Sequence, residues 1–150
     1  MSSFTLQELS ESKDLIAIQE RTVKFQEVDA AGTIFFPRIL EYFADNYNGL
    51  LEKAGLDVPR MLKERTLAAP LAHAEATFLH PLFFGDRVAV EIRRTRLGKT
   101  SLTVGHRLVK DGRTMAIGTT AHVFVDGKTF KKAEVPPELV GYLKPFQRDA

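Results

Sequence analysis

The sequence predicts an α+β domain in which one long helix packs against an antiparallel sheet. Three observations support this fold class. A helical apolar pattern runs from Pro37 to Ala54, and strand-like alternation fills most of residues 71–125. Two Asp-Gly pairs, Asp111-Gly112 and Asp126-Gly127, divide the later region in the way that hairpin turns do. One helix followed by several turn-linked strands is typical of α+β architecture.

The long helix is predicted to begin at Pro37, because proline suits the first turn of a helix. From Ile39 to Ala54, apolar residues recur at steps of three and four, which places them on one face. Gly55 is the expected C-terminal cap. The apolar stripe runs the whole length, so this helix is expected to pack against a broad surface.

The other elements are predicted from alternation and from turn residues. A strand is expected from Leu15, with Arg21, Val23 and Phe25 on one side, followed by a turn at residues 27–32. After the long helix we expect a short helix at 59–65, about four hairpin-linked strands, and a final short helix at 137–143. The predicted strands are 71–78, 87–97, 100–110 and 113–125.

Length and composition limit the class of protein. A chain of 150 residues fits one domain, which we place at 15–150, after a polar N-terminal extension at 1–14 that is loose or locally helical. Lys plus Arg is 21 and Asp plus Glu is 19, a balance that argues against nucleic acid as a partner. The absence of cysteine removes disulfides, thiolate metal sites and cysteine nucleophiles.

The sequence also favours a protein that does not enter a membrane. No apolar run approaches the roughly 18 residues that a membrane-spanning helix needs. The first eight residues lack a basic start followed by an apolar stretch, so no signal peptide is expected. A cytoplasmic location is therefore predicted.

The segment Asp29–Pro37 is the candidate site. It places a carboxylate, a glycine turn and an apolar run just before a helix, whose first N–H groups lack partners and carry partial positive charge. Such a terminus can hold an oxyanion, and Asp29 could attack a carbonyl or activate water. Gly32 allows a tight turn or a close approach to a ligand. Asp-x-x-Gly is also a common turn, in which Asp29 only bonds to local backbone.

The segment Val23–Arg38 resembles the opening of the 4-hydroxybenzoyl-CoA thioesterase family of hotdog-fold proteins. The shared pattern is a strand ending in an aromatic residue, then Asp-x-x-Gly, a hydrophobic-aromatic pair, proline and the central helix. The similarity covers roughly residues 18–140, and it continues through Gly55-Leu56, Pro81-Leu82, Gly85-Asp86 and Leu97–Ser101.

This resemblance implies a sheet wrapped round the long helix and the hydrolysis of an acyl-CoA thioester. Asp29 matches the catalytic carboxylate, as nucleophile or general base. Phe36 matches the position whose backbone N–H polarises the thioester carbonyl, and Gly32 matches the family glycine. Neither a cofactor nor a metal is expected. The resemblance also implies a homo-oligomer whose subunits pair through their sheets, as a dimer or, often, a tetramer.

Departures from the family pattern limit the substrate. Thr33 and Arg38 stand where many relatives have other residues. Ala44 replaces the aspartate that helps the hydroxybenzoyl enzyme recognise its ring hydroxyl, and Asp45 points about a quarter-turn away. An aromatic acyl group, such as hydroxybenzoyl or dihydroxynaphthoyl, stays compatible with a pocket lined by aromatic side chains. The candidates are Phe35, Phe36, Tyr42, Phe43 and Tyr47, of which core packing is favoured for the last two.

A basic cluster around Gly98 is the candidate site for the phosphates of CoA, because phosphates take charge-assisted hydrogen bonds from cations. Arg96 and Lys99 are the preferred cations, with Thr100 and Ser101 as hydroxyl donors, and in similar enzymes this region contacts the nucleotide. The alternative is a solvated basic edge that discourages strand aggregation.

The histidines give weaker signals. His73 and Glu75 would share one face of a strand, as an acid/base pair or as two metal ligands, but no third ligand is evident. A structural or substrate-lining role is favoured for them. His80, His106 and His122 are scattered, and no role is assigned to them.

Three other functions stay open. A hotdog hydratase or dehydratase would need a histidine beside the carboxylate, and residues 37–54 contain none. A non-catalytic acyl-CoA binding module would use the basic turn but would not require Asp29. A thioesterase acting on acyl-carrier-protein esters is a narrower variant of the first reading.

Overall fold

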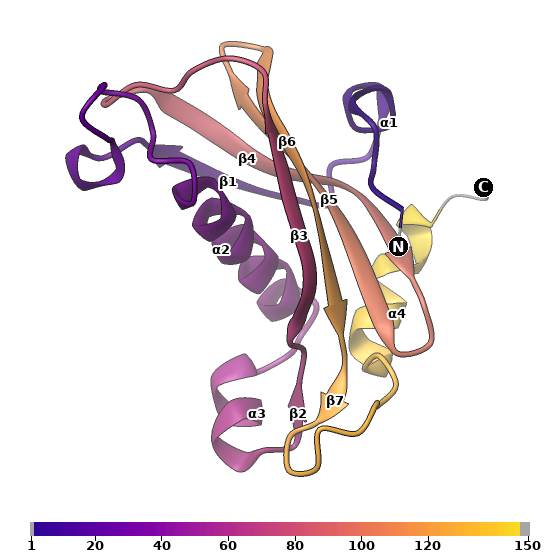
Figure 1. Cartoon of the computed structure of the whole chain (residues 1–150). Coiled ribbons are helices and arrows are strands. Elements are labelled where there is room, and N and C mark those ends of the chain that lie inside the picture. The colour runs from indigo at the N-terminus through magenta and orange to yellow at the C-terminus, as the bar shows by residue number, and fades with distance from the viewer. Residues whose placement is uncertain (1, 148–150) are drawn as a thin grey trace.

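A curved five-stranded antiparallel sheet wraps round one long helix, α2 (Arg38–Lys53), as Figure 1 shows. The computed structural model describes residues 2–147. The strand order is β1 (Ala17–Thr22), β4 (Arg87–Leu97), β5 (Ser101–Lys110), β6 (Arg113–Val123) and β3 (Leu71–Phe78). A two-stranded ladder of β2 (Leu67–Ala68) and β7 (Val125–Asp126) extends it. The predicted α+β class is confirmed.

The connection between β3 and β4 differs from the prediction. The strands β4, β5 and β6 are joined by hairpins, but β3 pairs with β6 and β4 pairs with β1. The expectation of about four hairpin-linked strands is therefore wrong for residues 79–86, which cross from one edge of the sheet towards the other. The physical reason is that β1 occupies the free side of β4. An isolated bridge between Thr33 and Phe83 brings this crossover beside the loop before α2.

The first strand is shorter than predicted. β1 ends at Thr22, and residues Phe25–Glu27 form the 3-10 helix η1. The alternation predicted for Val23 and Phe25 is wrong, because Val23 is fully buried whereas Phe25 is 74% exposed. The Glu27 side chain accepts a hydrogen bond from the Lys24 N–H (2.9 Å), which closes the chain into this turn.

Helix α2 has the predicted ends, with Pro37 as N-cap and Gly55 in the left-handed region just after the C-cap. Its apolar face meets the sheet closely at Gly118, where an added Cβ would lie 2.3 Å from the ring of Phe43. The core under α2 has two parts. One lies under its first half, with Val88, Val90 and Leu108, and the other lies under its second half, next to α4 (Pro137–Leu143).

The N-terminal segment is locally helical, as one of the two expectations had it. Helix α1 (Leu6–Glu11) is capped by Thr5 and lies on the face of the sheet opposite α2 (Figure 1). Phe4 and Leu9 are buried against Gly105 of β5. The remaining short elements are α3 (Val58–Glu64) and η2 (Lys144–Phe146). Within residues 2–147, no helix is long and apolar enough to cross a membrane.

Candidate active site

The loop between β1 and α2 is a tight turn that needs glycine at one position. The Gly32 N–H donates to the Asp29 carbonyl (3.0 Å), and the Asp29 N–H donates to the Thr33 carbonyl (2.8 Å). Gly32 has φ +83°, which a residue with a side chain rarely adopts. A Cβ added there would meet nothing within 4 Å. The positive φ supports the tight turn predicted for Gly32.

The turn fixes the Asp29 side chain but leaves it accessible. Its Oδ1 atom accepts the Ala31 N–H (2.9 Å), the geometry of a turn stabilised by an aspartate side chain. The Thr33 hydroxyl lies 3.5 Å from each carboxylate oxygen, which is a weak contact. The side chain is exposed to solvent. The structural reading of Asp29 and the catalytic reading are thus compatible, since Oδ1 holds the turn while the residue stays exposed.

The start of α2 offers a free backbone donor. The Phe35 N–H is bound to the Glu27 carbonyl (2.8 Å), and the Arg38 N–H to the Phe35 carbonyl (2.9 Å). Between them, the Phe36 N–H has no hydrogen-bond acceptor among residues 2–147. It lies at the positive end of a 16-residue helix, where developing negative charge is stabilised.

Asp29 and Phe36 border the same pocket, which we call the Asp29 pocket. Its volume is about 390 Å³, and its walls are the loop before α2 and the start of the β3–β4 crossover, from Phe78 to Leu82. His80, whose role could not be predicted from the sequence, is part of the wall. Its Nδ1 atom lies 2.9 Å from Arg113, and a guanidinium only donates, so Nδ1 accepts this bond.

His80 could not be found from the sequence, because its position depends on the crossover. The Ile34 N–H donates to the Leu82 carbonyl (2.8 Å), which ties the segment after β3 to the loop that carries Asp29. No local pattern in the sequence encodes that contact. It follows only once β3 and β4 lie on separate parts of the sheet.

A buried carboxylate beneath the loop was also missed. Glu27 is 5% exposed and accepts hydrogen bonds from the Tyr42 hydroxyl (2.8 Å) and the Lys24 N–H (2.9 Å). Arg21 lies 3.8 Å from its second oxygen and stacks over the Tyr42 ring. We call Arg21, Glu27 and Tyr42 the Glu27 group. Burial, reinforced by Glu27, raises the pKa of Tyr42 above its usual range, so its hydroxyl stays a donor. Tyr42 therefore anchors the loop.

The other aromatic candidates divide between two pockets. Phe36, which is 67% exposed, lines the Asp29 pocket and meets Phe35 edge-on. Phe35 itself is 47% exposed beside it. Phe43 and Tyr47 are core residues, as favoured, but both also line a second pocket between α2 and β3.

The predicted phosphate site lies at the opposite end of the sheet. The Asp29 loop adjoins the Arg87 end of β4, and the basic turn follows Leu97 at the other end of that 11-residue strand (Figure 1). A strand of 11 residues spans roughly 33 Å. There, Arg96 stacks over Phe4 and bonds to the Ser2 carbonyl, and Lys99 pairs with Glu134 (3.6 Å). Thr100 and Ser101 are half-buried beside them. One chain does not bring the two predicted sites together.

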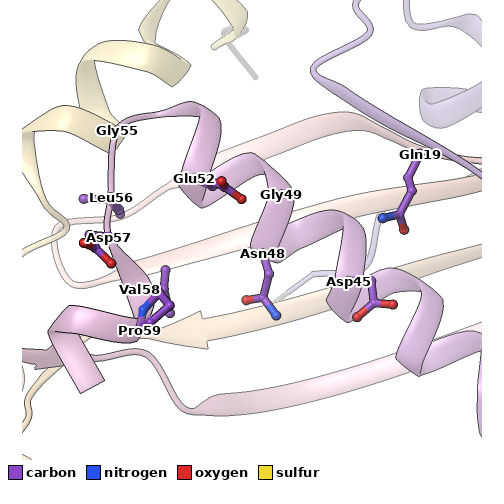
Figure 2. A pocket seen from close by; sticks show the side chains of 10 residues that line it. All are labelled: Gln19, Asp45, Asn48, Gly49, Glu52, Gly55, Leu56, Asp57, Val58 and Pro59. Atoms are coloured by element: carbon purple, nitrogen blue, oxygen red, sulfur yellow. The ribbon is translucent and has the colours of Figure 1, made fainter. Parts of the chain in front are cut away.

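A larger hollow of about 780 Å³ lies on the outer face of α2 (Figure 2). Asp45, Asn48 and Glu52 line it from successive turns of the helix, and Asp57 and Gln19 border it. None of the predicted site residues does so. Asp45 pairs with Arg21, and Ala44 lines the pocket on the other side of α2, so Asp45 points away as expected.

His73 and Glu75 share one face of β3, with Nε2 and Oε2 3.2 Å apart. Hydrogen bonds from Ser3 and His73 lower the pKa of Glu75. Both side chains are exposed. Among the residues that the structure describes, no group of three or more His, Asp and Glu side chains is placed to hold a metal ion.

Comparison with known proteins identifies the family. Residues 23–143 match the Thioesterase-like superfamily. The 1,4-dihydroxy-2-naphthoyl-CoA hydrolase of Nostoc punctiforme is 30% identical over 130 residues, which cover 87% of this chain and 88% of that protein. The corresponding hydrolase of Thermosynechococcus vestitus is also 30% identical, over 132 residues that cover 87% of this chain and 90% of that protein.

Solved structures agree on the fold. A 1,4-dihydroxy-2-naphthoyl-CoA thioesterase from Synechocystis superimposes with a TM-score of 0.79 at 23% identity, covering 85% of this chain and 95% of that one. A gentisyl-coenzyme A thioesterase gives 0.75 at 24% identity, covering 81% and 98%. The chain belongs to the Thioesterase-like superfamily, has the hotdog fold and is a thioester hydrolase.

Proposed function

We propose that this protein hydrolyses aromatic acyl-CoA thioesters to the free acid and CoA, as a cytoplasmic homo-oligomer. The observation that carries the proposal is that Asp29 and Phe36 border one pocket and that the Phe36 N–H has no acceptor among residues 2–147. A thioester hydrolase needs a base or nucleophile beside a donor for the carbonyl oxygen, and these two groups fit those roles. The curated relatives act on 1,4-dihydroxy-2-naphthoyl-CoA, which supports an aromatic acyl group.

The reaction assigns a role to each group. The thioester carbonyl accepts a hydrogen bond from the Phe36 N–H, so charge that develops on its oxygen meets the helix N-terminus. Asp29 either takes a proton from a water molecule whose oxygen adds to the carbonyl carbon, or adds to that carbon itself to form an anhydride that water then opens. In both routes the carbon–sulfur bond breaks, and CoA leaves as a thiolate that takes up the released proton.

The position of the basic turn fits a site shared between subunits. Arg96, Lys99, Thr100 and Ser101 lie too far from Asp29 to serve the same active site within one chain. The edge strand β3 has no neighbour beyond it in the five-stranded sheet, and Leu71 and Phe78 on it are 55% and 42% exposed. The proposal therefore includes pairing through β3, so that a second subunit brings its basic turn to the phosphates of CoA.

Release of free thiol from a panel of aryl-CoA and aliphatic acyl-CoA esters tests the proposed reaction. Asp29→Asn should lower kcat by about 100-fold or more, because it removes the base or nucleophile but keeps an acceptor for the turn. The matched control is Asp111→Asn, which lies in the β5–β6 turn at a positive φ that asparagine tolerates. Equal loss in both variants, or none in either, would remove Asp29 from the mechanism.

The same panel separates the alternatives. Turnover of an enoyl-CoA without thiol release would identify a hydratase. Tight binding with no turnover would identify a binding module. Faster hydrolysis of the same acyl group on a carrier protein than on CoA would identify an acyl-carrier-protein thioesterase. Lys99→Ala should raise KM for acyl-CoA but not for the corresponding pantetheine thioester, which lacks the nucleotide phosphates. Light scattering of the intact protein measures its oligomeric state.

A further inference from the structure

A second pocket opens between α2 and β3, and we call it the α2–β3 pocket. Its volume is about 230 Å³. Most of its wall is apolar, from Leu40, Phe43 and Ala44 on the helix and from Leu71 and Ala74 on the strand. The polar side chains that reach it are Tyr47, Asn48, Thr120 and His122. A small apolar pocket with a few polar groups is typical of a site for a small ligand group.

This pocket continues the line that starts at the Asp29 pocket. Phe36 borders the Asp29 pocket, and Leu40 of the α2–β3 pocket is four residues further on, roughly 6 Å along the helix. On the other wall, Phe78 and Ala74 share one face of β3 because they are an even number of residues apart. The two pockets therefore follow one another along the α2–β3 seam, in the direction that an acyl group held at the Phe36 N–H would take along the helix.

The polar end of the pocket is built from a chain of hydrogen bonds. The Thr120 hydroxyl lies 2.8 Å from Nε2 of His106 and 3.0 Å from Nε2 of His122. His106 stacks on Phe43, and His122 stacks on Tyr47. We call Tyr47, His106, Thr120 and His122 the His122 group. Tyr47 is 5% exposed, and its hydroxyl has no hydrogen-bond partner among the described residues.

One proton on the threonine hydroxyl sets the state of both rings. Thr120 can donate to only one imidazole, so the other must donate to it. The Nδ1 atom of His106 is buried and unpaired, and a buried donor without a partner is rarer in proteins than a buried acceptor without one. His106 therefore carries its proton on Nε2 and donates to Thr120, and Thr120 donates to Nε2 of His122.

This arrangement leaves His122 with its proton on Nδ1. That atom has no hydrogen-bond partner within residues 2–147 and is not among the fully buried unpaired atoms, so it keeps some accessible surface on a residue that lines the pocket. Burial lowers the pKa of His122 to about 4, and burial together with His122 lowers that of His106 to about 3. Near neutral pH the polar end is thus uncharged, with an N–H on His122 and, on Tyr47, a buried hydroxyl that has no partner among the described residues.

We propose that the α2–β3 pocket holds the distal end of an aromatic acyl group and that Tyr47 and His122 recognise a ring hydroxyl on it. This inference rests on the proposed function and adds the specificity residues. A phenolic hydroxyl matches the site because it can accept the His122 N–H and donate to the Tyr47 oxygen. A carboxylate would meet no positive charge there, and an unsubstituted ring would leave both groups unpaired.

The experiment compares hydroxylated with unsubstituted substrates in matched tyrosine variants. The substrates are 1,4-dihydroxy-2-naphthoyl-CoA against 2-naphthoyl-CoA, and 3- and 4-hydroxybenzoyl-CoA against benzoyl-CoA. Tyr47→Phe keeps the ring that stacks on His122 and removes only the hydroxyl. It should lower kcat/KM for a hydroxylated ester by roughly tenfold or more, with little change for its unsubstituted partner. His122→Phe should likewise reduce the ratio of kcat/KM for the hydroxylated ester to kcat/KM for the unsubstituted ester. Tyr142→Phe, near the C-terminus, should leave this ratio unchanged.

The outcomes separate this inference from the proposed function. If thiol is released and every hydroxylated-to-unsubstituted ratio is the same in wild type and Tyr47→Phe, the specificity role is overturned and the thioesterase stands. If no aryl-CoA is hydrolysed, the proposed function fails. Calorimetric binding of the free hydroxyaryl and aryl acids then tests whether the α2–β3 pocket recognises a ring hydroxyl. Preferential binding of the hydroxylated acid that Tyr47→Phe abolishes supports the inference, and equal binding overturns it.

Discussion

Two groups of buried polar side chains lie under α2, and they differ in how completely their hydrogen bonds are made. In the Glu27 group, the carboxylate receives a tyrosine hydroxyl and a backbone N–H and faces a guanidinium. In the His122 group, the Tyr47 hydroxyl and Nδ1 of His106 have no hydrogen-bond partner within residues 2–147. Satisfied buried networks make a structure rigid, whereas an unpaired buried polar group costs free energy until a partner satisfies it. The first group thus holds the loop that carries Asp29, and the second is the group that we propose to meet the substrate.

The largest expected effect comes from breaking the satisfied group. Glu27→Ala leaves the Tyr42 hydroxyl and the Lys24 N–H without their acceptor, and it should lower the free energy of unfolding by about 3 kcal/mol. It should also lower kcat, because the loop that carries Asp29 loses its anchor. Urea unfolding and thiol release measure the two effects. Glu20→Ala, which removes an exposed carboxylate paired with Arg87, should stay within about 0.5 kcal/mol of wild type.

The next effect is the acid sensitivity of the His122 group. In the folded protein, burial lowers the pKa of His106 to about 3 and that of His122 to about 4, below the ordinary histidine value of about 6.5. The unfolded chain therefore binds protons first as pH falls. Stability should be complete above about pH 6.5 and should decline below it, by up to about 1.4 kcal/mol per pH unit for each ring.

Urea unfolding at several pH values from 7.5 to 5 measures this decline. His122→Phe should remove the contribution of one ring and flatten the curve, while His73→Phe, at an exposed position on β3, should not. An unchanged slope in His122→Phe would show that His122 is not held neutral by the fold.

A smaller loss of stability is expected at Tyr42, which is one of two buried tyrosines on α2; the other is Tyr47. Tyr42→Phe removes a donor to the buried Glu27 carboxylate and should lower the free energy of unfolding by about 1.5 kcal/mol. Thermal and urea unfolding of this variant, beside Tyr142→Phe, check the value. A Tyr42→Phe protein as stable as wild type would mean that the Glu27 group is not an anchor.

The smallest effect is expected at Tyr47. Removing a hydroxyl that has no partner relieves a buried unpaired group, so Tyr47→Phe should be as stable as wild type or more stable by up to about 1 kcal/mol. The same substitution is expected to weaken selection of hydroxylated substrates, so stability and specificity should move in opposite directions. A clear loss of stability would indicate that the hydroxyl has a structural partner in the folded protein.

The sequence predicted the elements whose limits are set by local chemistry. The strands Leu71–Phe78 and Arg87–Leu97 and the helix Pro137–Leu143 have the predicted bounds, because proline and glycine mark their ends. At Asp111-Gly112 both residues have positive φ, as the hairpin turn requires. Asp29, Gly32 and Phe36 were placed together because they are neighbours in the chain.

The features that could not be predicted from the sequence depend on pairing between segments far apart in the chain. The crossover brings His80 to the Asp29 pocket because β1 pairs with the edge of β4 that β5 leaves free. No local sequence pattern encodes this pairing. The histidines His106 and His122 looked scattered because 15 residues and a hairpin separate them, yet one threonine hydroxyl joins them. The basic turn was recognised as a cluster, but its distance from Asp29 is a property of the folded sheet.

The edge position of β3 fixes what any two-fold symmetric pairing through that strand would do. The Phe78 end of β3 adjoins the Asp29 pocket, and the Leu71 end is level with His122 and the start of β5, next to the basic turn. A two-fold axis across an antiparallel strand pair reverses direction, so each molecule would present its Leu71 end to the Phe78 end of its copy. The meeting of the Leu71 end of each molecule with the Phe78 end of the other is thus a consequence of strand direction alone.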